Sequence, residues 1–224
     1  MNNSDYIKYH CHYLNNGASV SDGGATYNYL MGVNHFFSIC ENKTVLEIGP
    51  FSGLHTALIS DYKPQHITLV EANPECNNVL TRQFPDATVI TQDIFYFLEK
   101  PYKVDVAVCC GVLYHLHSPI YLLELIVNKT DPEYIILESV VIENDKRGYE
   151  YTEVETEVDN IPGNRYTSSG WKSAGVNIKL SQELLDLVMN NLGYCIVKKD
   201  DNLGRFKSES KKFASMTLYK KKDD

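Results

Sequence analysis

Short apolar runs alternate with amphipathic segments along the chain from residue 44 onward. The run Val104–Cys110 is nearly all apolar, as expected for a central parallel strand covered on both faces. Strands are also predicted at Val45–Ile48, Ile67–Glu71, Ala87–Ile90 and Tyr134–Val140. Helices are predicted at Leu54–Ser60, after Asn73-Pro74, after Ser118-Pro119, and through Leu184 to Leu192. This alternation predicts a doubly wound α/β fold with helices on both faces of the sheet.

The two ends of the chain extend this pattern. Tyr194–Lys198 and Ala214–Tyr219 read as a final antiparallel pair, which brings the predicted sheet to seven strands. Ala25–Cys40 has helical spacing and follows the breaker Asp22-Gly23-Gly24, so it is expected either to cap a ligand or to pack on the sheet. We therefore expect an N-terminal helical cap over residues 1–43 and one main domain over residues 44–224.

The segment 141–180 is too long for a simple connection and is expected to form a β-arm or lid. Within it, Thr152–Val158 alternates with period two and places Glu153, Glu155 and Glu157 on one face. That acidic face could attract a cationic substrate, or it could protect an edge strand from aggregation. Polar residues of the same segment could line a substrate site: Asn164, Arg165, Tyr166, Trp171, Lys172 and Asn177.

Composition narrows the classes of function. The net charge of −8 over 224 residues disfavours a dominant nucleic-acid role, although basic residues gather between Arg205 and Lys222. The six cysteines form no CxxC pair, so neither a zinc site nor a disulfide framework is expected, and His10-Cys11-His12 resembles a metal cluster only superficially. No signal peptide and no apolar run of membrane-spanning length is visible, so a cytoplasmic location is expected.

The stretch from Thr44 to His55 carries the clearest chemistry. It reads as a buried strand, a sharp turn bracketed by Gly49 and Gly53, and the start of a helix, with the acidic Glu47 near the strand end. Such a turn lets a ligand approach the backbone, and the helix start offers free N–H groups. A carboxylate beside it suits a ligand that carries a cation or an amine, and this combination indicates S-adenosylmethionine (SAM) rather than a dinucleotide.

Three later strand ends also carry polar or glycine residues. Glu71 ends the second strand and could accept both hydroxyls of a ribose. Asp93 and Ile94 follow the third strand, where they could bind the amino group and the ring of an adenine. Gly111 follows the fourth strand and opens the segment Gly111–Pro119. Because open α/β sheets bind ligands at the carboxyl ends of their strands, these residues are expected to lie at one edge.

In this order and spacing, the four segments resemble motifs one to four of the class I SAM-dependent methyltransferases, a Rossmann-like superfamily. The likeness covers about residues 40–140. Gly111-Val-Leu-Tyr-His-Leu-His-Ser-Pro119 is similar to the GVLYH segment of enzymes that modify the wobble uridine of tRNA, as is Ile135–Val140. The glycine loop departs from the superfamily's acidic-x-G-x-G-x-G pattern because Phe51 stands at the middle glycine, which puts SAM affinity in question.

The resemblance implies SAM as cofactor and S-adenosylhomocysteine (SAH) as product. It places the methionine moiety on Glu47 and the loop Gly49–Gly53, the ribose on Glu71, and the methyl group near Gly111. The implied cofactor residues are Glu47, Gly49, Pro50, Phe51, Gly53, Glu71, Ala72, Asp93, Ile94, Cys110 and Gly111. No metal is implied.

Tyr114 and His115 are the candidates for catalysis. A neutral His115 could take a proton from the acceptor as the methyl transfers, or it could only hold its loop in place. His117 reads as a solvated residue before the next helix. Methyl transfer depends mainly on alignment, so no base is strictly required.

We therefore expect a methyltransferase that acts on a small molecule. A tRNA-modifying enzyme is the alternative of the same class. A catalytically inert SAM-fold scaffold, suggested by Phe51, is an alternative of another class. An NAD-dependent oxidoreductase is disfavoured because Gly49-x-x-x-Gly53 is not the dinucleotide fingerprint.

Overall fold

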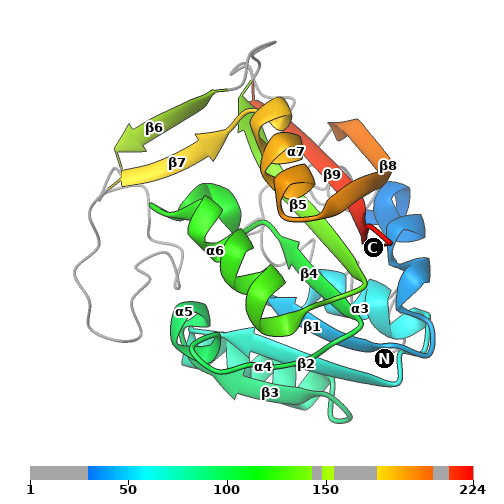
Figure 1. The fold of residues 1–224 in the computed structure, drawn as a ribbon. Helices are drawn as coiled ribbons and strands as arrows, with labels where there is room; N and C mark the ends of the chain where they lie inside the picture. Colours follow the sequence, from blue (N-terminus) through cyan, green and yellow to red (C-terminus); the bar gives the residue numbers. More distant parts are fainter. Residues whose placement is uncertain (1–29, 143–147, 154–175, 204–211, 224) are drawn as a thin grey trace.

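The computed structural model describes residues 30–142, 148–153, 176–203 and 212–223. Its centre is a seven-stranded sheet with the order β3-β2-β1-β4-β5-β9-β8 (Figure 1). Strands β1 to β5 pair in parallel, and β9 is antiparallel to both β5 and β8. The strands are β1 (Thr44–Ile48), β2 (His66–Glu71), β3 (Thr88–Thr91), β4 (Val106–Cys110), β5 (Tyr134–Ile142), β8 (Tyr194–Leu203) and β9 (Lys212–Lys221). The predicted α/β class, the parallel strands and the antiparallel final strand are confirmed.

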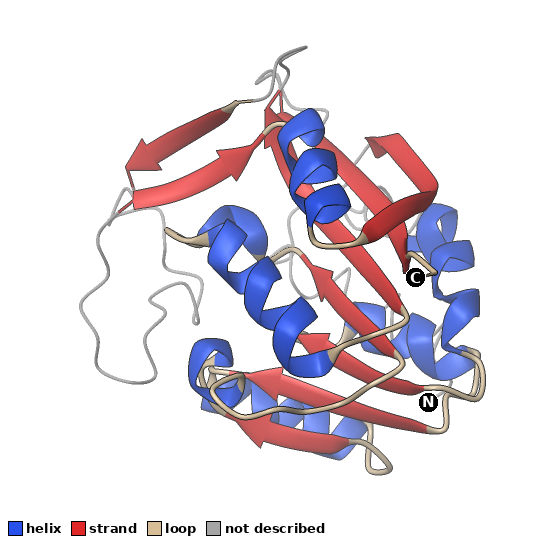
Figure 2. Cartoon of the chain, viewed as in Figure 1, coloured by secondary structure: helices blue, strands red, loops and turns tan. Residues whose placement is uncertain are grey.

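Helices cover both faces of this sheet (Figure 2). One face packs against η1 (Asn34–Cys40), α3 (Leu54–Asp61) and α4 (Pro74–Gln83). The other packs against α5 (Ile94–Phe97), α6 (Pro119–Leu125) with its π-helical extension η3 (Ile126–Thr130), and α7 (Gln182–Asn191). Neighbouring strand residues alternate between the two cores: Val45, Val108 and Ile136 belong to the first, and Leu46, Ala107 and Ile135 to the second. The sheet is therefore buried on both sides, as the apolar strands predicted.

Local capping explains where several helices begin. The Asn73 side chain accepts a hydrogen bond from the Glu75 N–H at 2.8 Å, and Pro74 occupies the first helical position, as predicted. The Ser181 hydroxyl accepts from the Leu184 N–H at 3.2 Å and starts α7. Asp93 caps the short helix α5, which the sequence pattern did not predict.

The N-terminal segment differs from the predicted uniform helix over Ala25–Cys40. Its described part begins at Leu30 as α-helix and changes to the 3₁₀ helix η1 at Asn34. Phe36 and Phe37 are almost fully buried against the sheet, so packing fixes this segment more strongly than helical propensity does. Residues 25–29 lie outside the described part, as does His10-Cys11-His12.

A second, two-stranded sheet forms an arm beyond the carboxyl end of β5 (Figure 1). Strand β6 (Tyr149–Glu153) pairs antiparallel with β7 (Val176–Leu180). Only the first two residues of the predicted arm Thr152–Val158 fall in β6, and residues 154–175, including Asn164 and Trp171, lie outside the described part. Residues 205–211 of the predicted basic segment lie outside it too, and the rest of that segment falls in β9 and just after it. Among the described helices, none has the length and apolarity to cross a bilayer.

Candidate active site

The strand register brings the predicted site residues to one edge. Ile48 of β1 lies level with Val70 of β2 and with Cys109 of β4. Glu71 and Cys110, each one residue further along, therefore flank the turn that starts at Gly49. On the outer side, Glu71 lies level with Thr91 of β3, just before Asp93. The geometry thus gathers all four predicted segments at the carboxyl edge of the parallel strands.

The turn between β1 and α3 has three residues in the left-handed region. Gly49, Phe51 and Gly53 have φ values of +63°, +53° and +83°. Two backbone hydrogen bonds fix the turn, from the Gly49 N–H to the Val70 carbonyl at 2.9 Å and from the Gly53 N–H to the Pro50 carbonyl at 2.8 Å. Phe51 therefore takes the conformation that a glycine would take there, at a cost of about 1 kcal/mol. The departure from the glycine pattern changes the side chain and leaves the turn in place.

Gly49 and Gly53 are needed for packing inside the protein. A Cβ on Gly49 would lie 2.6 Å from the Val112 Cγ2, which follows β4. A Cβ on Gly53 would lie 2.4 Å from the Phe84 ring and 2.9 Å from the Leu80 side chain. The sequence reading explained these glycines by ligand approach alone, and the structure adds tight contacts to neighbouring elements.

Glu47 is a carboxyl group with very little exposure, at 1%. Its Oε2 accepts a hydrogen bond from the Thr56 hydroxyl of α3 at 2.7 Å. Burial, with a smaller contribution from nearby Glu71, raises the pKa of Glu47 to about 7. A buried carboxylate of this kind is stabilised by a cationic partner, so it fits the ammonium group of a SAM methionine moiety.

Glu71 holds the loop together. Its Oε1 accepts from the Asn73 N–H at 2.8 Å and its Oε2 from the Phe51 N–H at 3.0 Å. Burial raises the pKa of Glu71, and these backbone donors act against that rise. The Asn77 amide donates to the Glu71 carbonyl at 2.8 Å and fixes the strand end. A carboxylate has about four lone-pair positions, so the two N–H bonds leave acceptor capacity that fits ribose hydroxyls.

The predicted adenine residues lie at the same edge, each half-buried. Asp93 Oδ1 accepts from the Phe95 N–H at 2.8 Å, so Asp93 serves as a helix cap. Ala72 directly follows the end of β2, and Ile94 follows Asp93 after the end of β3. The structure thus brings these residues to the carboxyl edge beside Glu71.

The loop after β4 carries the candidate catalytic residues. Gly111 has φ +76° and donates its N–H to the Glu138 carbonyl at 3.0 Å. Tyr114 and His115 lie in the short helix η2 (Leu113–His115), half-buried, with ring centroids 4.2 Å apart. The Ile178 N–H of β7 donates to the Leu116 carbonyl at 2.9 Å, so the arm supports this loop. His117 is exposed, as predicted.

Glu138 is a site residue that the sequence reading did not single out. It is fully buried on β5, and its Oε2 lies 3.7 Å from the position that a Cβ on Gly111 would take. The Tyr114 hydroxyl lies 3.8 Å from the same position. The signal in the sequence was a charged residue inside the apolar run Tyr134–Ile142, because charged side chains are rarely buried without a reason.

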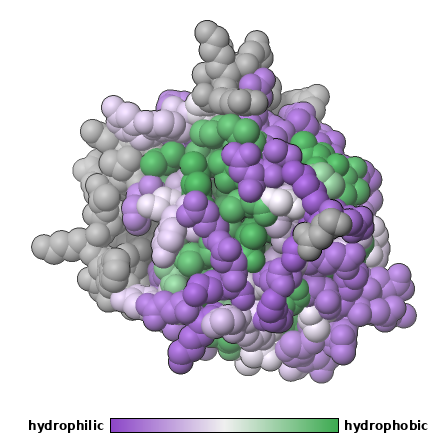
Figure 3. Space-filling model, viewed as in Figure 1, coloured by the Kyte–Doolittle hydropathy of each residue, from purple (hydrophilic) through white to green (hydrophobic). Residues whose placement is uncertain are grey.

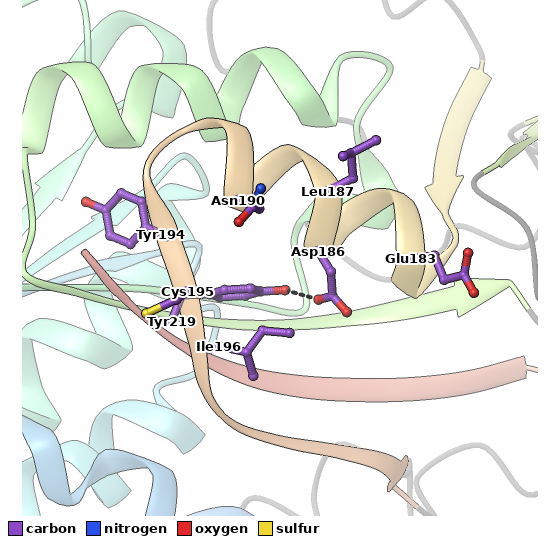
Figure 4. Close-up of a pocket in the computed structure, with 8 residues that line it drawn as sticks. All are labelled: Glu183, Asp186, Leu187, Asn190, Tyr194, Cys195, Ile196 and Tyr219. Atoms are coloured by element: carbon purple, nitrogen blue, oxygen red, sulfur yellow. Dashed lines mark hydrogen bonds between the residues drawn. The ribbon is translucent and has the colours of Figure 1, made fainter. Parts of the chain in front are cut away.

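A cavity of about 530 Å³ lies elsewhere, between α7 and the paired strands β8 and β9 (Figure 4). It is lined by Glu183, Asp186, Leu187, Asn190, Tyr194, Cys195, Ile196 and Tyr219. The Tyr219 hydroxyl donates to Asp186 Oδ1 at 2.7 Å across it. Tyr194 and Tyr219 lie near the end of the sheet where β5 begins, opposite the carboxyl edge, so this cavity is separate from the gathered site residues.

No protein-family model and no curated relative matches the sequence. Solved structures match over most of the chain. The N-terminal domain of EvdMO1, crystallised with SAH and D-fucose, has a TM-score of 0.62 at 14% identity and covers 87% of this chain and 82% of its own. The 1,6-didemethyltoxoflavin-N1-methyltransferase of Burkholderia thailandensis, with SAH bound, has a TM-score of 0.61 at 14% identity and covers 99% and 87%. The [4+2]-cyclase SpnF has a TM-score of 0.60 at 12% identity and covers 88% and 82%.

The fold is that of the class I SAM-dependent methyltransferases. The sequence resemblance to this superfamily is confirmed at the level of fold. SpnF is described as a cyclase, so the same architecture supports more than one chemistry. The fold alone therefore does not define the reaction, which depends on the residues at the carboxyl edge.

Proposed function

We propose that the protein is a SAM-dependent methyltransferase that acts on a small-molecule acceptor. The observation that carries the proposal is the pair of buried carboxylates, Glu47 and Glu71, around the left-handed turn between β1 and α3. Burying two carboxyl groups side by side is costly, and a ligand that offers an ammonium group and two hydroxyls offsets that cost. SAM offers both groups on one molecule.

In this proposal Glu47 and the loop Gly49–Gly53, with Pro50 and Phe51, hold the methionine moiety. Glu71 accepts from the ribose, while Ala72, Asp93 and Ile94 surround the adenine. Cys110 and Gly111 border the methyl group, which SAM supplies as an electrophile on a sulfonium. The protein's main contribution is to hold the acceptor atom, the methyl carbon and the sulfur in a line.

Tyr114 and His115 have roles on the acceptor side. Their half-buried position in η2, beside Gly111, allows one or both to contact the acceptor. As a base, His115 would take the acceptor's proton; as a positioning residue, it would hold η2 through its contact with the Tyr114 ring. His115→Ala should lower turnover about 100-fold with SAM affinity unchanged in the first case. In the second case affinity and stability fall together with activity.

A small-molecule acceptor is favoured by charge and by the neighbours. The net charge of −8 opposes binding of a tRNA backbone. One neighbour is a 1,6-didemethyltoxoflavin-N1-methyltransferase with 1,6-didemethyltoxoflavin bound, and EvdMO1 was crystallised with D-fucose. An inert scaffold was suggested by Phe51, and that argument is weaker because Phe51 keeps the glycine-type turn and donates its N–H to Glu71.

Isothermal titration with SAM and with SAH tests the proposal directly. We expect saturable binding of at least one of them, with SAH competing against SAM for a single site. The control is Glu75→Ala, which removes an exposed carboxylate four residues after Glu71 and should bind like the wild type. Folded protein that shows no heat with either ligand at millimolar concentration would contradict the proposal.

A further inference from the structure

Glu138 stands at the point where the proposed methyl transfer takes place. Its carboxylate is fully buried, and its Oε2 and the Tyr114 hydroxyl lie 3.7 Å and 3.8 Å from the position that a Cβ added to Gly111 would take. Gly111 itself is tied to β5 by its hydrogen bond to the Glu138 carbonyl. The Glu138 carboxylate of β5 and the Tyr114 hydroxyl of η2 thus both lie beside Gly111, directly after the end of β4.

Glu138 faces the same side of the sheet as Glu47, the carboxylate that is proposed to bind the amine of SAM. Val45, Cys110 and Ile136 face the core that contains η1 and α3. Side chains alternate along a strand, so Glu47 and Glu138, two residues beyond Val45 and Ile136, face the same side. Only β4 separates β1 from β5, which puts the two backbones roughly 10 Å apart across the sheet. That span accommodates a methionine arm with its amine at Glu47 and its reacting end near Gly111.

We propose that Glu138, together with the Tyr114 hydroxyl, forms a binding position for a cationic amine, so that the methyl acceptor is an amine nitrogen. The inference rests on the proposed methyltransferase function. A buried carboxylate at this point attracts an ammonium ion and repels an anionic acceptor such as a carboxylate or a phenolate. The negative charge of the Glu138 carboxylate on β5 thus selects an amine over an anionic acceptor.

The proposed reaction needs only the acceptor, SAM and the Glu138 carboxylate. The acceptor binds as an ammonium ion and passes one proton to the Glu138 carboxylate. The freed lone pair on nitrogen forms a bond to the methyl carbon while the carbon–sulfur bond breaks and its electron pair remains on sulfur, which gives SAH. The methylated amine leaves as an ammonium ion, and Glu138 releases its proton to solvent.

Sinefungin is a probe for this position that does not depend on knowing the acceptor. In this SAM analogue a carbon that bears an amine replaces the methylated sulfonium, so its ammonium occupies the place of the methyl group. SAH has the same skeleton without that charge. The wild type should therefore bind sinefungin about tenfold or more tightly than SAH, the effect of one charged hydrogen bond.

Glu138→Gln keeps the shape of the side chain and removes the charge, so the ratio of the SAH and sinefungin dissociation constants should fall to near one. SAH affinity itself should change little. Tyr114→Phe should lower the ratio by a smaller factor, because it removes a neutral hydroxyl. The matched control is Glu124→Gln, an exposed carboxylate on α6, which should keep the wild-type ratio.

The outcomes separate this inference from the function on which it rests. Wild-type protein that binds SAH and sinefungin equally overturns the inference, whatever the variants do, and leaves SAH binding established. An unchanged ratio in a folded Glu138→Gln variant overturns it as well. If Glu138→Gln does not fold, the wild-type ratio and the Tyr114→Phe ratio still decide. Failure of the wild type to bind SAM or SAH removes the proposed function and this inference together.

Discussion

The carboxyl edge of the sheet has two halves that are built differently. On the β1–β2 half, Glu47 bonds to Thr56 and Glu71 bonds to Phe51 and Asn73, all partners within 20 residues along the chain. On the β4–β5 half, the loop after Gly111 depends on Glu138 of β5 and on β7 of the arm, which are distant in sequence. The first half is therefore a local motif, and the second is assembled by the tertiary structure.

The surface away from this edge shows a third kind of environment. On the viewed face in Figure 3, hydrophobic residues gather where Figure 1 draws α7 and again where it draws β8. Ile196 and Val197 of β8 are 45% and 54% exposed at the open edge of the sheet. Lys198 and Lys199 follow them directly, and charges of this kind protect an edge strand from pairing with another chain. Strand β8 therefore exposes apolar side chains, whereas the carboxyl edge of the sheet buries carboxyl groups.

The largest expected effect tests the buried charge in the local half. The folded pKa of Glu47 is raised from 4.5 to about 7, so its contribution to stability is complete below pH 4.5 and is lost as pH rises to 7. The loss is about 3 kcal/mol in the free energy of unfolding. Glu47→Gln imitates the protonated group and should lack this loss. Its stability relative to wild type should therefore increase between about pH 5 and pH 8 in urea unfolding.

The comparison with Glu47→Gln isolates one group, because the raised pKa of Glu71 affects both proteins in the same direction. Parallel pH profiles for the two proteins would mean that Glu47 stays ionised in the fold. In that case its partner would have to be stronger than the Thr56 hydroxyl alone.

The next effect concerns Glu71, which combines a loop role with the proposed ribose role. Glu71→Ala should weaken SAH binding by roughly 1.5–3 kcal/mol, the range for hydrogen bonds to a charged group. It should also lower the melting temperature, because the Phe51 and Asn73 N–H groups lose their acceptor. Calorimetry and thermal unfolding on the same samples separate the two roles. A lower melting temperature with unchanged SAH affinity would leave only the loop role.

A third effect tests whether the two halves are coupled at Gly49. Gly49→Ala adds a Cβ 2.6 Å from Val112 in a left-handed position. Gly193→Ala is the matched control, since Gly193 has φ +89° and no atom within 4 Å of an added Cβ. Gly49→Ala should cost about 2 kcal/mol more than Gly193→Ala in urea unfolding. Val112→Ala should recover part of that difference, and independent effects of the two substitutions would show that the halves are not coupled there.

The two halves of the carboxyl edge also differ in how much of each could be predicted from the sequence. The turn after β1 and the Asn73 cap follow from local patterns, and the predicted strand positions agree closely with the structure. Glu138 was missed although its charge interrupts an apolar run, because its place beside Gly111 depends on β5 pairing with β4. The change to 3₁₀ helix at Asn34 and the π-helical turn after Leu125 were missed for the same reason, since packing against the sheet decides them.

The smallest effect concerns Phe51, the departure that raised the inert alternative. Glycine normally destabilises a fold relative to alanine, because it has more freedom in the unfolded chain. At φ +53° the order should reverse, because alanine keeps the left-handed penalty and glycine does not. Phe51→Gly should therefore be more stable than Phe51→Ala by up to about 1 kcal/mol in urea unfolding. Both variants keep the backbone N–H that Glu71 accepts, so both should bind SAH like the wild type. If SAH binding instead falls in both, the Phe51 ring contacts the cofactor, and the local half is a site specialised by its side chain as well as by its backbone.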